Sequence, residues 1–221
     1  ISTESGVPDF RSPGGIWSKY KPVYYQDFMT DKEEQKRYWE MKKEAHTQYK
    51  NVKPNLNHSM MTHFIKQKQL LGIITQNVDG LYQQAGIDTR FLLELHGTDR
   101  LAICQMCGDQ KDIEPFYKQV LPPGPCKRCG GLLKVGTISF GQSLDKSVLK
   151  KAQLWLKEAD VLLVMGSSLV VQPAASLILL ATKAKRYLIN REATPLDHYM
   201  DHCFYEETKT FWLDYQHFLS T

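Results

Sequence analysis

Four of the five cysteines form two Cys-x-x-Cys pairs, Cys104/Cys107 and Cys126/Cys129, with the 18 residues 108–125 between them. Pairs at this distance match the zinc-ribbon pattern, in which four thiolates complete a tetrahedron around one ion. Four thiolates leave no open coordination position, so the predicted Zn²⁺ is a single structural ion. Disulfides or unrelated thiols are the alternative, and a nucleic-acid-binding ribbon is disfavoured because the surrounding charge is mixed and aromatic residues are sparse.

Polar residues also follow three apolar runs that are typical of buried strands. The runs 70–75, 159–165 and 186–189 lead into Gln76-Asn77-Val78-Asp79-Gly80, Gly166-Ser167-Ser168 and Asn190-Arg191-Glu192, respectively. Ligands of open α/β sheets bind outside the carboxyl ends of the strands. Amides, hydroxyls, carboxylates and backbone N–H groups at three such ends suit a ligand of ribose and phosphate. Each segment alone is commonly a simple turn, so the prediction depends on their joint occurrence.

His96 follows a fourth apolar run, residues 91–95, and precedes Gly97. A histidine titrates near neutral pH, which suits it to proton transfer in catalysis. A purely structural histidine is the alternative. No Ser-His-Asp arrangement or His-Glu-x-x-His motif competes with it in the sequence. His96 is therefore a candidate for proton transfer.

The elements that must hold these residues alternate between strands and helices. The segment 173–185, between the last two strands, is predicted to be helical, and this alternation indicates an α/β fold with a parallel sheet covered on both faces. Upstream, the capping-box spacing Thr30-x-x-Glu33 predicts a helix that continues to about Lys50. A second helix is expected over 57–68. The apolar faces of these two helices are Tyr38, Met41, Ala45 and Tyr49, and Met60, Met61, Phe64 and Ile65, respectively.

Composition excludes several classes of protein. The 221 residues are 42% apolar and 24% charged, as in a folded protein with one large domain or one domain and a small satellite, and unlike a disordered or fibrous chain. The net charge of +4 is too weak to indicate nucleic acid or membrane as partner. The longest apolar stretch, around 177–181, is far below the roughly 20 residues of a membrane span. Free or metal-bound thiols suit a reducing compartment, so we expect a cytoplasmic protein.

The chain resembles the sirtuins, which are NAD-dependent protein lysine deacylases. The resemblance extends over nearly the whole chain, in family order and spacing, and rests on Ser5-Gly6-Val7-Pro8-Asp9-Phe10-Arg11, Thr75-Gln76-Asn77-Val78-Asp79-Gly80-Leu81, Leu95-His96-Gly97, the four paired cysteines, Phe140-Gly141 and Gly166-Ser167-Ser168-Leu169-Val170-Val171-x-Pro173. It implies a Rossmann-like parallel-sheet domain (1–18, 60–103 and 136–221), a helical insertion with a cofactor loop (19–59) and an inserted zinc ribbon (104–135). NAD and an acyl-lysine peptide would bind between the domains.

The resemblance also implies roles for individual residues. Asp79 would hold the nicotinamide carboxamide, Asn77 would order the ribose side of the pocket, and His96 would be the general base. Ile138 and Phe140 would line the acyl-lysine tunnel, and the backbone near Gly141 and Val170 would pair with an extended peptide. The other cofactor contacts would come from Thr3, Phe10, Arg11, Gln76, Val78, Gly166, Ser167, Ser168 and, near the adenosine ribose, Asn190 and Glu192.

The implied reaction begins with loss of nicotinamide, which leaves a positively charged ribosyl carbon that Phe10 would shield from water. The acyl oxygen attacks this carbon, and a ribose hydroxyl activated by neutral His96 then attacks the resulting imidate. The products would be free lysine, nicotinamide and O-acyl-ADP-ribose. We expect acyl-lysine proteins or peptides as partners, no membrane or nucleic acid, and a monomer.

Two departures from the family pattern bear on function. In the family, a strand and a Gly-Ala-Gly turn precede the segment written here Ile1-Ser2. We expect that they precede it in the full protein, because the loss of a central strand would cost many kcal/mol and a whole domain is stable by only about 5–15 kcal/mol. Otherwise the NAD site lacks a phosphate anchor and binds NAD weakly. In the second case a non-catalytic NAD- or ADP-ribose-binding module is the alternative function, and a plain NAD hydrolase is another.

The second departure concerns the acyl group. Relatives that prefer negatively charged acyl groups carry a Tyr-x-x-Arg pair shortly after the segment 38–41, and this chain has Lys42 and Lys43 there instead. Because a planar Arg is the expected partner for a carboxylate, acetyl-lysine is favoured over succinyl-lysine. Ser139 stands where relatives often carry an aromatic residue, and Gln142 where they carry Glu, so a deacylase acting on longer chains is the alternative. Cys203, outside the zinc pattern, is expected to be a partly buried, inert thiol.

Overall fold

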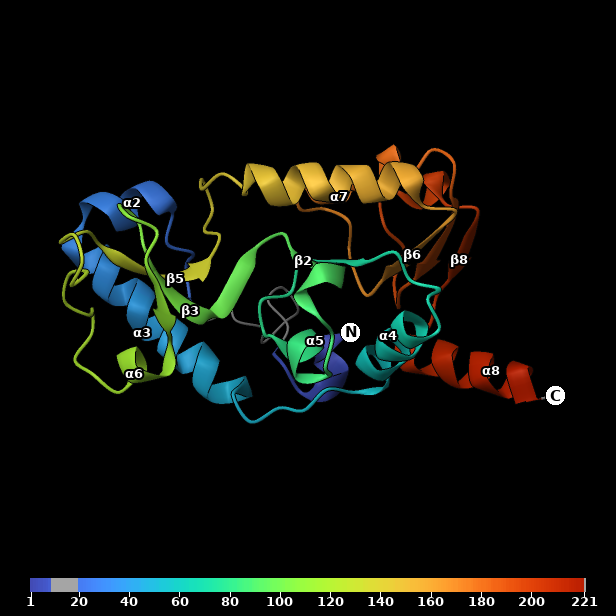
Figure 1. The fold of residues 1–221 in the computed structure, drawn as a ribbon, viewed down its shortest axis with the longest axis horizontal. Helices are drawn as coiled ribbons and strands as arrows, with labels where there is room; N and C mark the ends of the chain where they lie inside the picture. The colour runs from blue at the N-terminus through green and yellow to red at the C-terminus, as the bar shows by residue number, and fades with distance from the viewer. Residues whose placement is uncertain (9–19, 221) are drawn as a thin grey trace.

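The computed structural model describes residues 1–8 and 20–220 (Figure 1). Five of its strands are parallel and form two groups. β6 (Val161–Met165), β7 (Lys185–Ile189) and β8 (His202–Phe204) make one sheet in that order, and β1 (Ile73–Thr75) pairs with β2 (Leu92–Glu94). These are the four strands that the apolar runs predict, each with slightly different bounds, together with β8. The predicted parallel arrangement is confirmed.

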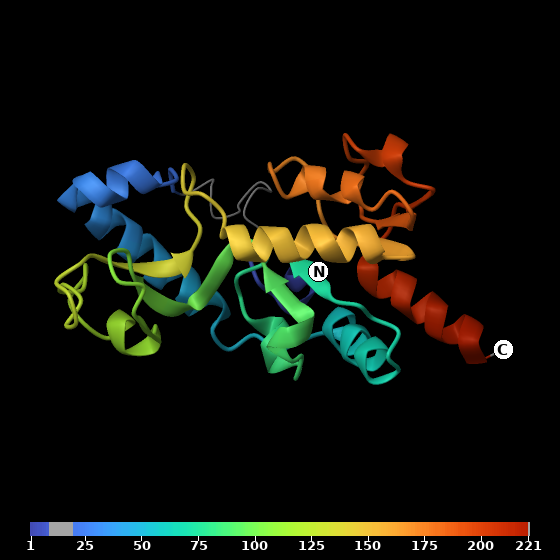
Figure 2. The same ribbon diagram turned by 45° about the horizontal axis from the view of Figure 1, so that its top comes forward.

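Helices cover these strands from two sides, as the α/β prediction requires. On one side, Ala152 and Leu156 of α7 (Lys146–Glu158) pack with Leu93 of β2 and with Leu177 of the 3₁₀ helix η3 (Ala175–Leu180). α7 lies along the upper side of the molecule in Figure 1 and crosses the front of the molecule in Figure 2. On the other side, α4 (Leu56–Lys66) and α8 (Thr208–Ser220) form a second core with β1 and β2. Its buried residues include Met60, Met61, Ile73, Leu92 and Trp212.

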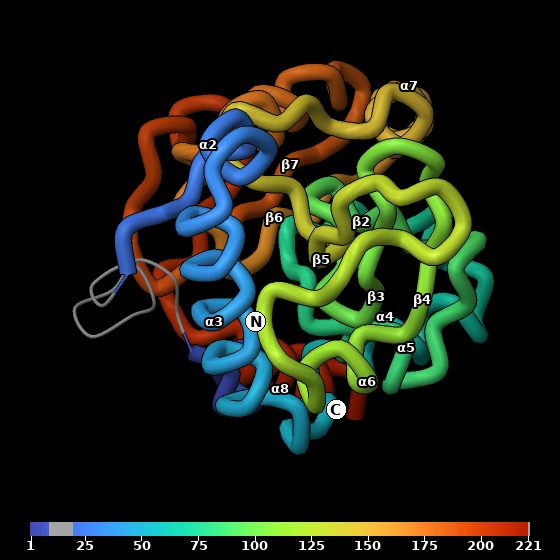
Figure 3. The backbone as a smooth tube through the Cα atoms, turned by 90° about the vertical axis from the view of Figure 1, so that its left-hand side faces the viewer, coloured from blue at the N-terminus to red at the C-terminus, as the bar shows by residue number. Residues whose placement is uncertain are grey.

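A separate antiparallel sheet, in the order β4-β3-β5, lies at one end of the molecule. It consists of β3 (Gly97–Cys104), β4 (Gln110–Asp112) and β5 (Leu133–Thr137), with the short helix α6 (Glu114–Tyr117). Helices α2 (Tyr25–Thr30) and α3 (Lys32–Tyr49) pack against this sheet rather than against the parallel strands, and Figure 3 shows α3 running beside it. Their shared core includes Phe28, Tyr38, Trp39, Ala102 and Val135.

The remaining short elements connect these layers. They are the 3₁₀ helices η1 (Ser2–Ser5), η2 (Thr89–Phe91) and η4 (Asp197–Tyr199) and the single-turn helix α5 (Leu81–Gln84). Among the described helices, none combines the length and the apolar character needed to cross a bilayer.

Two local predictions are wrong. Thr30 does not cap the long helix, because it is the last residue of α2 and its hydroxyl donates to the Gln26 carbonyl. The cap is Asp31, whose carboxylate accepts from the amides of Glu33 and Glu34. The segment 173–185 is not an α-helix. Only residues 175–180 are helical, in the tighter 3₁₀ form, and no side chain caps their start.

Candidate functional site

The loops after β1 and β6 meet the start of the chain. The Gln76 side-chain amide donates to Ser167 Oγ at 3.4 Å, and the Asn77 side-chain amide donates to Ser2 Oγ at 2.7 Å. Ile1 lies so close to Gly166 that a Cβ on that glycine would stand 2.7 Å from the Ile1 nitrogen. Gly166 also has a φ of +59°, which favours glycine. Two of the three predicted polar strand ends are therefore in direct contact.

The third strand end lies beside Gly166 but makes mainly local contacts. The Gly166 amide donates to the Ile189 carbonyl at 2.9 Å, which puts the end of β7 next to the turn after β6. The Asn190 side-chain amide donates to the Glu192 carbonyl at 2.7 Å, and the Glu192 side chain is exposed. This carboxylate is thus open to solvent at the carboxyl end of the parallel sheet, where the sequence predicts a contact to a ribose.

His96 is held on both of its sides. Its ring Nδ1 lies 3.2 Å from the Gln76 carbonyl oxygen, and its own carbonyl accepts from the Ile138 amide at 2.8 Å. A carbonyl can only accept, so Nδ1 carries the proton and Nε2 of the neutral ring keeps a lone pair. Burial lowers the pKa of His96 below 6.5, against the opposing effect of the Gln76 carbonyl. The half-buried imidazole is therefore neutral at physiological pH, as a general base requires.

Gly97 explains why a glycine follows this histidine. Its φ is +72°, and a Cβ built on it would stand 2.0 Å from the Gly136 carbonyl oxygen. Any side chain would push β3 away from β5 at the point where His96 contacts Ile138. The close approach of the two backbones thus fixes the position of His96 relative to the predicted acyl-lysine strand.

Asp79 lies at the start of α5, three residues after Gln76. Its carboxylate accepts from the Leu81 amide at 2.9 Å, and Gly80 between them has a φ of +76°. Val78 is joined to the antiparallel sheet, because its carbonyl accepts from the Asp99 amide at 2.9 Å. Asp79 and Val78 are both half-buried. Among residues 1–8 and 20–220, the only hydrogen bond to the Asp79 carboxylate is this one, so its second oxygen can accept from another donor, such as a carboxamide.

Two of the predicted substrate-side residues are exposed and apolar. Phe140 and Val170 are 42% and 45% exposed. The Phe140 ring lies 6.0 Å from that of Tyr24, and its carbonyl accepts from the Tyr25 amide at 2.8 Å. Gly141 follows with a φ of +78°. Ile138 is half-buried and directly follows β5.

Several contacts of this site were not predicted. Ser2 and Tyr24 carry no motif in the sequence, and only the fold brings them to Asn77 and Phe140. Thr3 is exposed in η1, and Ser168 is exposed beside Ser167. The predictions for Phe10 and Arg11 fall outside the described residues.

The four paired cysteines converge on one point. Their Sγ atoms all lie within 4.8 Å of one another, with Cys104–Cys129 at 3.4 Å and Cys107–Cys126 at 3.9 Å. A tetrahedral zinc site with Zn–S bonds of about 2.3 Å has S–S edges of about 3.8 Å. The donor set and its spacing therefore fit one zinc ion. A Cβ on Gly131 would come within 2.9 Å of Cys104 Sγ, so this turn also needs a glycine.

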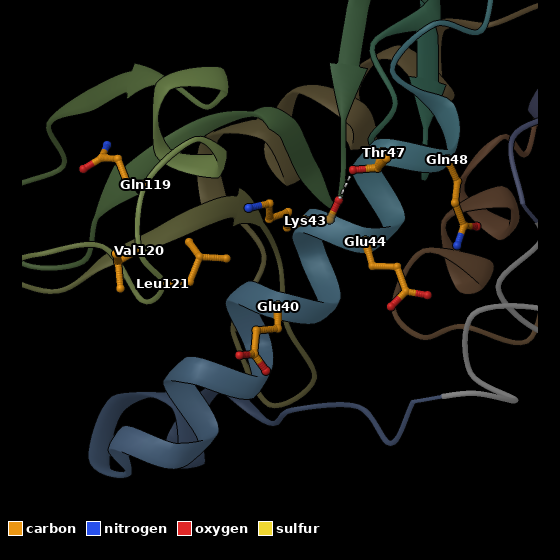
Figure 4. Close-up of a pocket in the computed structure, with 8 residues that line it drawn as sticks. All are labelled: Glu40, Lys43, Glu44, Thr47, Gln48, Gln119, Val120 and Leu121. Atoms are coloured by element: carbon orange, nitrogen blue, oxygen red, sulfur yellow. Dashed lines mark hydrogen bonds between the residues drawn. The ribbon is translucent and has the colours of Figure 1, made fainter.

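A surface pocket of about 640 Å³ lies away from all of these residues. It is formed by the outer face of α3 and a loop after α6 (Figure 4) and is lined by Glu40, Lys43, Glu44, Thr47, Gln48, Gln119, Val120 and Leu121. Its lining includes no residue of the predicted site. We therefore assign the chemistry to the strand ends and not to this pocket.

The model of the Sir2 family matches residues 1–173. The chain belongs to the Sir2 family. Its relatives include the NAD-dependent protein deacetylase of Thermodesulfovibrio yellowstonii, 37% identical over 93% of this chain and 82% of that protein. Another is NAD-dependent protein deacylase 1 of Archaeoglobus fulgidus, 37% identical over 89% of this chain and 80% of that protein.

Solved Sir2 structures share the fold. A Sir2 homologue bound to ADP-ribose superposes with a TM-score of 0.86 and 32% identity, over 96% of this chain and 84% of that one. A complex of Sir2 with a p53 peptide and NAD⁺ gives a TM-score of 0.83 and 30% identity, over 96% and 86% of the two chains. This agreement confirms the family and the α/β fold that the motifs predict for this Sir2 protein.

Proposed function

We propose that this Sir2 protein is an NAD-dependent protein lysine deacetylase, which transfers the acyl group of a modified lysine to ADP-ribose and releases nicotinamide. The observation that carries the proposal is the junction of His96, Gln76 and Ile138: the imidazole of His96 binds the Gln76 carbonyl in the loop after β1, and the His96 carbonyl binds the Ile138 amide at the end of β5. The names of the relatives and the ligands of the related complexes support the same activity.

His96 acts as the general base in this proposal. Its Nδ1 proton is committed to the Gln76 carbonyl, so Nε2 is the atom that accepts a proton from a ribose hydroxyl. NAD supplies the ribosyl carbon that becomes electrophilic when nicotinamide leaves. Asn77, held by Ser2, and Asp79, with one carboxylate oxygen on the Leu81 amide, orient the ribose and the carboxamide. Gln76 and Ser167 link the two loops that these groups line.

The exposed apolar residues Phe140 and Val170 bind the acyl-lysine peptide, beside Ile138 and the backbone of Gly141. Their exposed apolar surface would pack against the lysine methylenes of the bound peptide. The phosphates and the adenosine ribose are assigned to Thr3, Gly166, Ser168, Asn190 and Glu192.

The four cysteines hold one structural Zn²⁺, which supplies folding energy to the antiparallel unit and takes no part in the reaction. We also propose a cytoplasmic monomer with acyl-lysine proteins as partners. The proposed cytoplasmic location follows from the four metal-binding thiols, which need a reducing compartment.

The decisive assay measures nicotinamide release by the purified protein. We expect release only when both NAD and an acetylated peptide are present, with one unmodified peptide formed for each nicotinamide. Release from NAD alone would instead identify an NAD hydrolase. Binding of NAD or ADP-ribose with no release under any condition would identify a non-catalytic module, and nucleic-acid binding that falls steeply with salt would identify a ribbon of that class.

We expect acetyl-lysine to be preferred over succinyl-lysine. Lys42, which stands where a carboxylate-binding pair occurs in some relatives, is engaged with its own neighbours. Its ammonium lies 5.8 Å from the Tyr38 ring and interacts with Asp99, and burial lowers its pKa. A lysine offers a single ammonium in place of the two-pronged guanidinium of Arg, so Lys42 is a weak substitute for a planar Arg.

The measurement is kcat/KM on one peptide carrying acetyl, succinyl or myristoyl groups. We expect the acetyl peptide to exceed the succinyl peptide by at least about tenfold, or 1.4 kcal/mol. Equal values for the two would contradict the role given to Lys42. A higher value for the myristoyl peptide would assign the protein to the long-chain deacylases, as Ser139 allows.

A further inference from the structure

One fully buried lysine has no part in the reaction as proposed. Lys134 lies on β5 and has no exposed surface. Burying an ammonium group is costly unless it is paired or hydrogen-bonded. Its retention in the interior therefore needs an explanation in terms of what it contacts.

The Lys134 side chain runs along its own strand toward the strand's end. Its Nζ donates to the Thr137 carbonyl at 2.5 Å and lies 3.4 Å from the Val135 carbonyl. The β3–β5 pairing is irregular in this stretch, since Gly97 pairs with Thr137 but the next partners are Ala102 and Val135. Backbone carbonyls beside such an irregularity lose regular ladder partners and need another donor. Lys134 supplies that donor from within the core.

The other groups around Lys134 hold it in this orientation. Its Nζ lies 5.1 Å from the centroid of the Tyr38 ring, and the Tyr38 hydroxyl lies 3.3 Å from Thr137 Oγ1. Helix α3 thus contacts both the lysine and the residue whose carbonyl it binds. Burial, with a further contribution from nearby Lys42, lowers the pKa of Lys134 well below its ordinary value. Either protonation state of the amine retains N–H donors for the carbonyls.

The end of β5 is the part of the backbone that supports His96. Ile138 directly follows Thr137, and its amide donates to the His96 carbonyl at 2.8 Å. One residue before Thr137, the Gly136 carbonyl is pressed against Gly97. A rotation of the 137–138 peptide would therefore move both the predicted acyl-lysine strand and the backbone of His96.

We propose that Lys134 is a positioning residue for deacylation: by binding the Thr137 carbonyl it fixes the 137–138 peptide, and through the Ile138 amide it fixes His96. This inference rests on the proposed function. According to this inference, Lys134 affects the step in which His96 accepts a proton from the ribose hydroxyl, in addition to any effect on folding.

Two reactions of the same protein separate these effects. Exchange of labelled nicotinamide into NAD, in the presence of acetylated peptide, reports the reversible first step, which precedes proton transfer to His96. Peptide deacetylation requires both steps. Lys134→Met keeps the length of the side chain and removes its N–H donor. We expect the deacetylation rate to fall by about tenfold to 10²-fold, which is the effect of a shift of about 1 Å in the position of His96. The rate of nicotinamide exchange should fall much less. Lys134→Arg, which keeps N–H donors on a long side chain, should recover part of the deacetylation rate.

The matched control is Lys111→Met, which removes an exposed lysine from β4 of the same sheet and should leave both reactions unchanged. Equal losses of exchange and deacetylation in Lys134→Met, or no loss, would overturn the inference while leaving the proposed function intact. If Lys134→Met does not fold, Lys134→Gln tests the same ratio with a shorter neutral donor, and an unchanged ratio there refutes the inference. A wild-type protein that shows neither reaction would refute the proposed function itself.

Discussion

Replacing His96 by alanine is expected to lower the deacetylation rate by about 10²–10⁴-fold, the usual contribution of a general base. Within the part of the chain that the structure describes, the imidazole makes one hydrogen bond, from Nδ1 to the Gln76 carbonyl. The contact that holds the backbone, from the Ile138 amide, uses the His96 carbonyl and survives the substitution. Steady-state deacetylation of an acetylated peptide measures the loss, and thermal unfolding and zinc content should stay at wild-type values.

His63→Ala is the matched control for this variant. His63 is an exposed histidine on α4, remote in sequence from every predicted site residue, and its ring contacts Phe64 of the same helix. We expect wild-type turnover from it. Turnover retained by His96→Ala would show that another group accepts the proton, and a variant that unfolds would show a structural histidine.

Removing one zinc ligand is expected to abolish both metal binding and activity. Cys104 ends β3, and Cys104→Ser leaves three thiolates and a weaker oxygen ligand for the ion. Structural zinc contributes an apparent binding free energy of about 10–16 kcal/mol in small zinc domains, which is comparable with the whole stability of a domain. We expect the variant to contain no zinc, to unfold at lower temperature and to lose deacetylation. A chelator applied to the wild-type protein should have the same effect.

Cys203→Ser is the matched control, because it tests whether replacing a cysteine outside the cluster also removes zinc and activity. Cys203 is half-buried on β8, outside the cluster of four. This variant should keep its zinc and its activity. A zinc-free Cys104→Ser protein with wild-type stability and turnover would refute the structural role of the metal.

The strands that precede the candidate site were easier to predict from the sequence than the helices around them. The apolar runs before Gln76, Gly166 and Asn190 indicate strands because a parallel strand buried on both faces is continuously apolar. The spacing of the two Cys-x-x-Cys pairs likewise predicts that the four thiols meet around one metal ion. In contrast, residues 173–185 are as apolar as a buried helix, and only their packing against α7 and β2 decides that a short 3₁₀ turn forms.

Contacts between distant segments were the least predictable part of the site. Ser2 meets Asn77 and Tyr24 meets Phe140, yet each of these residues carries an ordinary side chain in an unremarkable context. The packing of α3 on the antiparallel sheet was also not apparent, because the apolar face of a helix does not say which layer it covers. Tertiary structure alone brings these groups together.

Strand β3 begins at Gly97, next to the candidate base, and ends at Cys104, a predicted zinc ligand. If fully extended, eight residues span roughly 25 Å. Charges that far apart in physiological salt are screened, since the Debye length is about 8 Å. The metal therefore has little electrostatic influence on the imidazole. Any dependence of the rate on zinc comes through β3, whose position the metal stabilises at one end and whose other end adjoins the proton acceptor.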